Sequence, residues 1–227
     1  MLGNENFKTV NEWLGWGDPK EGLWFIGMEE GELFTEETVS QFRGTNIGYS
    51  YVEADDRPKW PVANKIAKIA AHLLGLSNYE SYRDTVLWRK GSRVFNGNIL
   101  PLGKRSRSAW PEYYHDLFGV SHEEYRQYFN EHKDERYQRF RELRQEMKPQ
   151  AIVCFGKGFW QQFEDLFLSG SNEEPTRDGG CLVYQRARLI LAGHFSRGSA
   201  FPNTDLDILV NRLKLWKVQI GSTATTP

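Results

Sequence analysis

The sequence predicts an α/β protein with three layers, in which helices cover both faces of a four-stranded, mostly parallel sheet. Four short apolar runs are bounded by turn-forming residues, and segments with helical spacing alternate with them along the chain. A length of 227 residues suits one such domain. We place the domain at residues 1–220 and expect residues 221–227, which are small and polar, to form a disordered tail.

The predicted strands are the apolar runs Leu23 to Ile26, Val94 to Leu100, Ala151 to Phe155 and Leu189 to Ala192. Short continuous apolar runs are typical of strands that are buried on both faces of a parallel sheet. The polar stretch from Ser169 to Gly180 is interpreted as a surface loop between strands. Ligands of such sheets bind beyond the carboxyl ends of the strands, so the loops there are where we expect chemistry.

The helices are predicted from the spacing of apolar residues between these runs. From Pro61 onward, apolar residues recur at three and four positions until Gly75, a residue that suits the left-handed end of a helix. A long helix dense in charge is expected from His122 to Met147. Shorter helices are expected over residues 159–167 and from Leu206 to Trp216.

Composition limits the kinds of function that are open to the chain. The 29 basic and 30 acidic side chains give a net charge of −1, which excludes a global basic field, so any nucleic-acid site must be local. Cys154 and Cys181 are too few for a disulfide framework or a four-cysteine metal site, and we expect no metal and no cofactor. The sequence has neither a signal-peptide pattern nor a membrane-spanning apolar run, which predicts a cytoplasmic protein without membrane contact.

Two loops at strand ends carry unusual polar residues. After the first run comes Gly27-Met28-Glu29-Glu30-Gly31, whose glycines let the backbone approach a ligand and leave Glu29 at the lip of the sheet. A purely structural turn is the alternative. Asn98 lies among apolar residues at the end of the second run, where a buried amide needs partners. It either ties down a loop or is presented to a nucleobase, since one amide both donates and accepts.

The loop after the last run offers several hydrogen-bond donors in a compact space. His194 follows the strand directly, and Ser196, Arg197 and Ser199 come next. Hydroxyl and backbone N–H groups of such a loop can hold phosphates. A histidine in this position is more often structural than catalytic, but it shares the strand-end location with the two loops described above.

A short basic run follows the second strand. Lys104 and Arg105, with Arg107, are interleaved with serines on the same rim as Asn98. They form either a solvated loop or a phosphate contact. Lys157, which follows the third strand, and Arg197 extend the same positive rim into a local groove for nucleic acid.

With these loops in order, the chain resembles the uracil-DNA glycosylase superfamily. Residues 27–31 are similar to the Gly-Met-Asn-Pro-Gly motif of the single-strand-selective monofunctional branch, which implies that Glu29 activates the water. The same resemblance implies that Phe42 stacks on the extruded base and that Asn98, followed by Pro101, reads the uracil edge. The stretch from His194 to Arg197 resembles the closing His-Pro-Ser-Pro motif.

Several positions depart from the family pattern. Glu30 replaces the proline of the first motif, and Phe195 and Arg197 replace both prolines of the last, so these loops are expected to be less rigid. Gly198 stands where a wedge side chain often enters the duplex, which puts activity on double-stranded DNA in doubt. Gly31 replaces a bulkier residue of some branches and leaves room for 5-substituted uracils.

The resemblance implies a monofunctional DNA glycosylase that removes uracil or a related damaged base by base flipping and water attack. In this hypothesis Glu29 and His194 are catalytic, residues 27, 28 and 31 line the base pocket with Phe42 and Asn98, and the basic and serine residues contact DNA. One alternative is a module of the same fold that binds a nucleobase or nucleic acid without hydrolysis. Another is a hydrolase of a different N-glycoside or small nucleotide.

Overall fold

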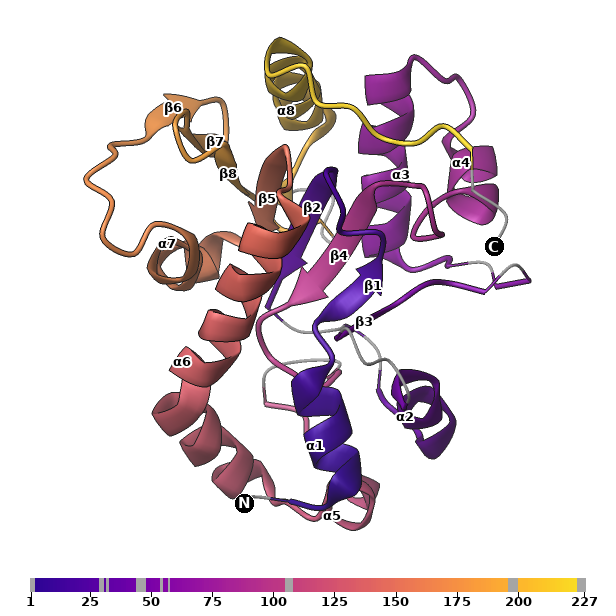
Figure 1. The fold of residues 1–227 in the computed structure, drawn as a ribbon, viewed down its shortest axis with the longest axis vertical. Coiled ribbons are helices and arrows are strands. Elements are labelled where there is room, and N and C mark those ends of the chain that lie inside the picture. The colour runs from indigo at the N-terminus through magenta and orange to yellow at the C-terminus, as the bar shows by residue number, and fades with distance from the viewer. Residues whose placement is uncertain are drawn as a thin grey trace.

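The computed structural model describes residues 3–28, 31, 33–43, 48–53, 55–56, 58–104, 108–195 and 200–223. Over these residues the chain is a mixed α/β structure built on one sheet with the strand order β3-β1-β4-β2-β5-β8-β7-β6 (Figure 1). The strands are β1 (Gly15–Gly17), β2 (Leu23–Gly27), β3 (Tyr49–Ser50), β4 (Val94–Asn98), β5 (Ala151–Phe155), β6 (Thr176–Asp178), β7 (Cys181–Tyr184) and β8 (Leu189–Ala192). The helices are α1 (Glu5–Glu12), α2 (Glu36–Phe42), α3 (Pro61–Leu74), α4 (Tyr79–Thr85), α5 (Tyr113–Phe118), α6 (His122–Met147), the 3₁₀ turn η1 (Lys157–Phe159), α7 (Trp160–Phe167) and α8 (Asn203–Leu215).

Four parallel strands form the centre of the sheet, in the order β4-β2-β5-β8. They confirm the four predicted apolar runs, although β4 ends at Asn98 rather than at Leu100. Every residue of these strands is buried. Burial along the whole strand is expected where helices cover both faces, and it explains why the runs are continuous rather than alternating.

The prediction of a four-stranded sheet is wrong in extent, because the described chain adds four more strands at the edges. Strand β1 pairs antiparallel with β4 and is followed by β3, whereas β7 pairs antiparallel with β8 and is followed by β6. These strands have two to four residues each. Segments this short do not display the period of two that marks a strand in sequence. Strand β6 lies inside the predicted loop from Ser169 to Gly180.

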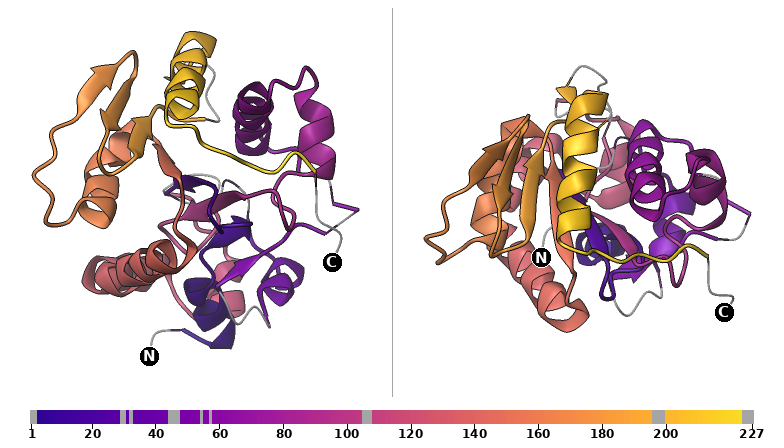
Figure 2. Two further views of the ribbon diagram at one scale, coloured as in Figure 1. Left: turned by 45° about the horizontal axis from the view of Figure 1, so that its top comes forward. Right: turned by 90° about the horizontal axis from the view of Figure 1, so that it is seen from above.

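Helices cover both faces of the central strands. Phe25 of β2 packs in a core cluster with residues of α3, α4 and α8, whereas its neighbours Trp24 and Ile26 pack in a second cluster with residues of α6 and α7. This division follows from the pleat, which directs successive side chains to opposite faces. Figure 2 shows α3, α4 and α8 gathered on one side of the sheet.

The two longest predicted helices are confirmed. Helix α3 has Pro61 in its first turn and ends at Gly75, whose φ of 72° is left-handed. Helix α6 begins with a capping box between Ser121 and Glu124, in which each side chain accepts a hydrogen bond from the other's backbone N–H. No helix in the described part of the chain is long and apolar enough to cross a membrane.

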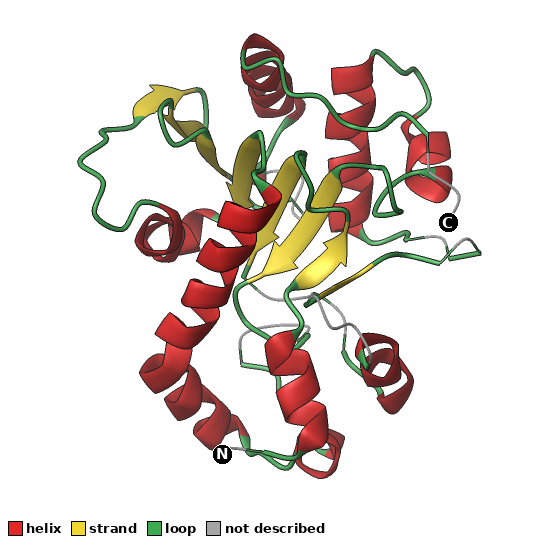
Figure 3. Ribbon diagram, viewed as in Figure 1, coloured by secondary structure: helices red, strands yellow, loops and turns green. Residues whose placement is uncertain are grey.

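A third core cluster lies next to the carboxyl ends of the central strands. It joins α1, α2 and α5 and contains Trp13, Phe34, Phe42 and Tyr114. In Figure 3 these helices lie beyond the arrowhead of β4. The cluster therefore adds an aromatic layer beside the sheet edge where ligands of parallel sheets bind.

Candidate functional site

The carboxyl ends of the four parallel strands lie at one edge of the sheet. Backbone hydrogen bonds connect the segments that follow neighbouring strands there. Beyond β4, the N–H of Ile99 donates to the carbonyl of Gly27 at 3.0 Å, and the N–H of Leu100 donates to Met28 at 2.6 Å. Beyond β5, the N–H of Gly156 donates to the carbonyl of Ala192 at 3.1 Å. The loops that carry the predicted site residues therefore leave the sheet side by side.

Asn98 lies against Gly27 at this edge. A Cβ atom placed on Gly27 would lie 2.9 Å from Oδ1 of Asn98 and 2.8 Å from Cζ of Phe155. Any side chain at position 27 would therefore displace the amide or the ring. Asn98 is 3 % exposed, so its amide is shielded from water, and hydrogen bonds are stronger in such a setting than in water. Because Gly27 has no side chain, the amide of Asn98 and the ring of Phe155 can both lie close to its Cα atom.

His194 lies against the second glycine of this edge. Gly156 has a φ of 121°, and a Cβ atom placed on it would lie 4.0 Å from Cδ2 of His194. The imidazole is half-buried. His194 follows β8 and Asn98 ends β4, so two strands separate them, and at about 4.8 Å per strand their backbones are about 14 Å apart. Both polar side chains thus border the glycine ends of the intervening strands β2 and β5.

Phe195 fixes the loop that carries His194. Its ring is 2 % exposed and stacks on Phe155, with 4.5 Å between centroids and 9° between planes. It also contacts the rings of Phe25 and Phe201. The loop was expected to lose rigidity because Phe195 stands in place of a motif proline. In the structure the buried ring anchors His194 to the core.

The backbone of Asn98 is held by Arg136 of α6, a residue that the sequence analysis missed. The guanidinium is buried and donates four hydrogen bonds to carbonyl oxygens. They run from Nε to Ile99 at 2.6 Å, from Nη1 to Asn11 at 2.6 Å, and from Nη2 to Trp13 at 3.0 Å and Asn98 at 2.8 Å. Burial lowers the pKa of Arg136 to about 9, because it disfavours the charged form.

Phe42 lies in the aromatic layer and not at the open edge. Its ring is 2 % exposed and stacks on Trp13, with 4.1 Å between centroids and 15° between planes. The edges of Trp16 and Phe34 also contact it. Trp13 covers one face of the ring, and the carbonyl of Trp13 shares Nη2 of Arg136 with Asn98. The stack is therefore linked to the site, and its role with a base stays a prediction.

The two described basic residues of the predicted rim differ in setting. Lys104 is 3 % exposed, and its Nζ lies 5.4 Å from the ring centroid of Tyr125. Lys157 is exposed, and its Nζ lies 5.7 Å from the ring of Trp160, whose Nε1 donates to the carbonyl of Ala192. Of the two, Lys157 is the better placed to meet a phosphate near the end of β8.

The remaining site predictions divide between described and undescribed positions. Met28 is half-buried and Gly31 is exposed, with no atom within 4 Å of the place that a Cβ would take. Five predicted residues lie outside the described part of the chain: Glu29, Arg105, Ser196, Arg197 and Ser199. Of the tail predicted from residue 221, Gly221 is bonded to Ser92, and residues 224–227 are outside the described part.

Neither cysteine is set up as a nucleophile. Cys154 and Cys181 are buried and free, and burial raises the pKa of both thiols, that of Cys181 to about 12. Within the described ranges, no group of three or more His, Cys, Asp and Glu side chains is arranged to hold a metal ion.

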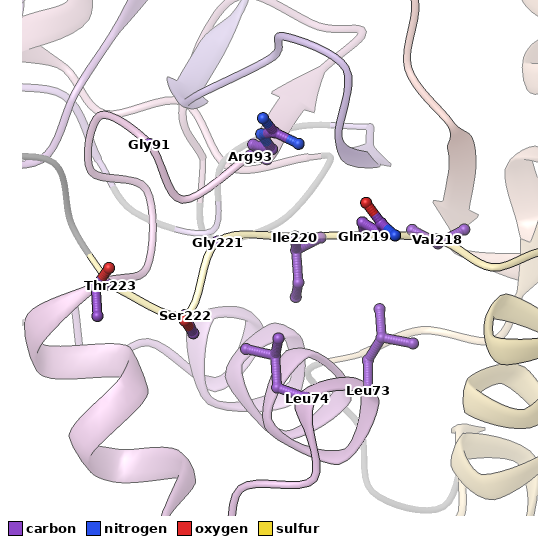
Figure 4. A pocket seen from close by; sticks show the side chains of 10 residues that line it. All are labelled: Leu73, Leu74, Gly91, Arg93, Val218, Gln219, Ile220, Gly221, Ser222 and Thr223. Atoms are coloured by element: carbon purple, nitrogen blue, oxygen red, sulfur yellow. The ribbon is translucent and has the colours of Figure 1, made fainter.

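A second pocket lies at the opposite edge of the sheet, away from the candidate site. Figure 4 shows it between the end of α3, the start of β4 and the segment from Val218 to Thr223, with Leu73, Leu74 and Ile220 labelled along it. None of the predicted site residues lines this pocket. It lies at the amino ends of the strands, where the parallel-sheet rule does not place a ligand.

The chain matches no protein-family model and no curated protein. Its candidate site is therefore defined by its own contacts. The central pair is the amide of Asn98 beside Gly27 and the imidazole of His194 beside Gly156.

Proposed function

We propose that this protein is a DNA glycosylase that hydrolyses the N-glycosidic bond of uracil or a related damaged base after the base has left the stack. One observation carries the proposal: Asn98 and His194 border Gly27 and Gly156 at a single edge of the parallel strands. We also propose that the fold is of the uracil-DNA glycosylase type. Its support is the parallel core in the order β4-β2-β5-β8, together with the order along the sequence of the three segments that resemble the family motifs.

The reaction breaks the bond between the sugar carbon and the base nitrogen, and water supplies the new oxygen substituent. Positive charge develops on the sugar and negative charge on the departing base, which finally takes up a proton. In this proposal the Asn98 amide donates to and accepts from the base edge. His194 donates a hydrogen bond to the oxygen of the base on which charge develops, and a neutral imidazole suffices. The carboxylate of Glu29 orients the water and offsets the charge on the sugar.

The surroundings of Asn98 favour recognition of a flipped base. Flipping costs a few kcal/mol, which hydrogen bonds and apolar contacts in the pocket must offset. The amide of Asn98 is already buried beside the ring of Phe155, and its backbone is fixed by Arg136. Binding a base there requires little further ordering of the protein, and preorganised donors are the most effective stabilisers of developing charge.

The alternative proposal is a module that binds a nucleobase without hydrolysing a bond. The burial of Phe42 and Lys104 favours it, because neither a stacking ring nor that ammonium is presented at the surface for a polymer. In that case Asn98 and His194 hold a free base or nucleoside.

The test is an oligonucleotide with one deoxyuridine, incubated single-stranded and in duplex and then treated with alkali to cleave abasic sites. We expect cleavage by the wild-type protein and a loss of about 10²–10³-fold in Asn98→Ala and in His194→Ala, since each removes one preorganised donor. The matched controls Asn172→Ala and His115→Ala change exposed residues and should keep full activity.

The proposal fails if no abasic site forms with uracil, hypoxanthine, xanthine or 5-substituted uracils. Calorimetry with free uracil then separates the alternatives. Binding without turnover, weakened by Asn98→Ala, supports the module. Hydrolysis of free nucleosides but not of polymers supports a hydrolase of small N-glycosides.

A further inference from the structure

A groove with a volume of about 760 Å³ is lined by residues of α6 and α7, and it shares no lining residue with the candidate site. The two helices lie side by side in Figure 1, and the segment from Ser169 to Pro175 and Tyr184 of β7 complete its walls. Five acidic side chains and two basic ones line it, so its charge is negative. The acidic residues are Asp134, Glu164, Asp165, Glu173 and Glu174.

Tyr137 gives this groove an unsatisfied polar group. The residue is 1 % exposed and lines the groove, and its hydroxyl has no hydrogen-bond partner among the described residues. Burial, together with the negative charges of Asp165 and Asp134, raises the pKa of the hydroxyl to about 12, and the positive charge of Arg141 opposes the shift in part. A buried hydroxyl without a partner destabilises the fold, and it points to a ligand that supplies the missing hydrogen bond.

Some of the acidic groups are already engaged in the fold. Glu164 accepts a hydrogen bond from the hydroxyl of Tyr184, and Glu173 accepts from the backbone N–H groups of Arg186 and Ala187. Tyr184 and Glu173 thus hold the wall of the groove in place.

Two of the acidic side chains make no hydrogen bond or ion pair within the described structure, so both oxygens of each carboxylate can accept from a ligand. No hydrogen bond or ion pair from the described residues reaches Asp134 or Glu174. Arg141 does not neutralise them, because its guanidinium donates to the carbonyl oxygens of Leu166 and Asp165 at 3.1 and 3.0 Å. Lys133 is the remaining basic residue of the lining.

We propose that this groove binds lysine side chains of an extended basic segment in a partner protein. An ammonium group carries three donors on a compact charge, so one group can donate to the Tyr137 hydroxyl and to a carboxylate at once. The lining on α6 runs from Lys133 to Arg141, about 12 Å at 1.5 Å per residue, which matches three or four residues of extended chain. The proposal does not depend on the glycosylase function, and the negative lining would repel DNA.

The test is calorimetry at low salt with a pentalysine peptide and, as its control, the same peptide acetylated on every side chain. We expect the pentalysine to bind and the acetylated peptide not to bind. Tyr137→Phe keeps the ring and removes the hydroxyl, and it should weaken binding about 2–10-fold, the equivalent of one hydrogen bond. Asp134→Asn combined with Glu174→Gln should weaken binding about tenfold, since it removes two charges near the ligand.

The matched control for charge is Asp116→Asn, whose carboxylate is 92 % exposed on α5. It should bind pentalysine as the wild-type protein does. Equal binding of the acetylated peptide, an unchanged affinity in Tyr137→Phe, or an equal loss in Asp116→Asn would overturn the proposal. Binding of spermidine without binding of pentalysine would also overturn it, because the groove would then take a free polyamine.

Discussion

Arg136 is the residue whose replacement tests most severely how the candidate site is built. Its guanidinium joins the carbonyl oxygens of Asn98 and Ile99 at the end of β4 to those of Asn11 and Trp13 before β1. Methionine has an unbranched, apolar side chain that fills part of the same space, and it removes all four hydrogen bonds. We expect Arg136→Met to destabilise the fold and to release the backbone of Asn98.

The size of the effect follows from two opposing contributions. Hydrogen bonds to a charged donor contribute about 1.5–3 kcal/mol each, so four of them amount to roughly 6–12 kcal/mol. Burial of the charge costs several kcal/mol, as the lowered pKa of Arg136 indicates, and this cost disappears in the methionine variant. We therefore expect a net loss of about 3–5 kcal/mol in the free energy of unfolding. For a chain of this size that corresponds to a fall of about 6–20 °C in Tm.

Thermal and urea unfolding followed by circular dichroism measure this loss. Arg139→Met is the matched control, because Arg139 makes one long hydrogen bond of 3.5 Å to Asn11; we expect it to change the unfolding free energy by less than about 1 kcal/mol. Arg136→Lys keeps the charge, but its single ammonium group cannot reach all four carbonyl oxygens. Its loss of unfolding free energy should therefore lie between those of Arg136→Met and Arg139→Met. A methionine variant as stable as the Arg139 control would refute the reasoning.

Three further predictions concern single positions. Gly27→Ala places a Cβ within 2.9 Å of Asn98 and Phe155, so calorimetry should record a loss of about 1–3 kcal/mol, and an unchanged Tm would contradict the packing. Gly31→Tyr meets no atom within 4 Å at its Cβ; stability should stay within about 0.5 kcal/mol while excision of 5-substituted uracils falls more than excision of uracil. Burial raises the pKa of Tyr137 to about 12, so its neutral form stabilises the fold below pH 10, and this is lost as pH rises to 12. Urea titrations should show that Tyr137→Phe loses less of its free energy of unfolding over that range than the wild-type protein does, and parallel curves would contradict the prediction.

The parallel core was predictable because each of its strands is buried on both faces. Continuous apolar runs such as Leu23 to Ile26 are a direct consequence of that burial. In the helices between them, such as α3, apolar residues recur every three or four positions. The edge strands carry no comparable signal. Strand β3 has only Tyr49 and Ser50, and its place is determined by pairing with β1, a tertiary contact that no local pattern encodes.

The sequence indicated that the candidate residues Asn98 and His194 lie at strand ends, but it did not indicate which residues support them. Asn98 and His194 stand out because polar residues at the ends of apolar strands need a reason. Arg136 gave a weaker signal: it lies seven residues after Phe129 and four before Phe140, on the apolar stripe of α6, where a charge must find buried partners. Those partners are backbone carbonyl groups. Every residue has one, so the amino-acid sequence does not indicate which of them Arg136 contacts.

Motif spacing does not determine the setting of Phe42. The resemblance implies that its ring stacks on a base, which stays a prediction, and the structure packs the ring on Trp13 inside the aromatic layer. An isolated aromatic residue has the same sequence signature in a core and in a binding site. Only the neighbours in space distinguish the two settings.

The most direct test of the account is whether Asn98 and His194 contact the same base. A titration of isotope-labelled protein with free uracil, followed by NMR, resolves the side-chain amide of Asn98 and the imidazole of His194 separately. We predict that both sets of signals shift along curves with one common Kd, and that the signals of His115 on α5 stay in place. Shifts at Asn98 alone, at His194 alone, or at neither would contradict the claim that these two side chains form one site.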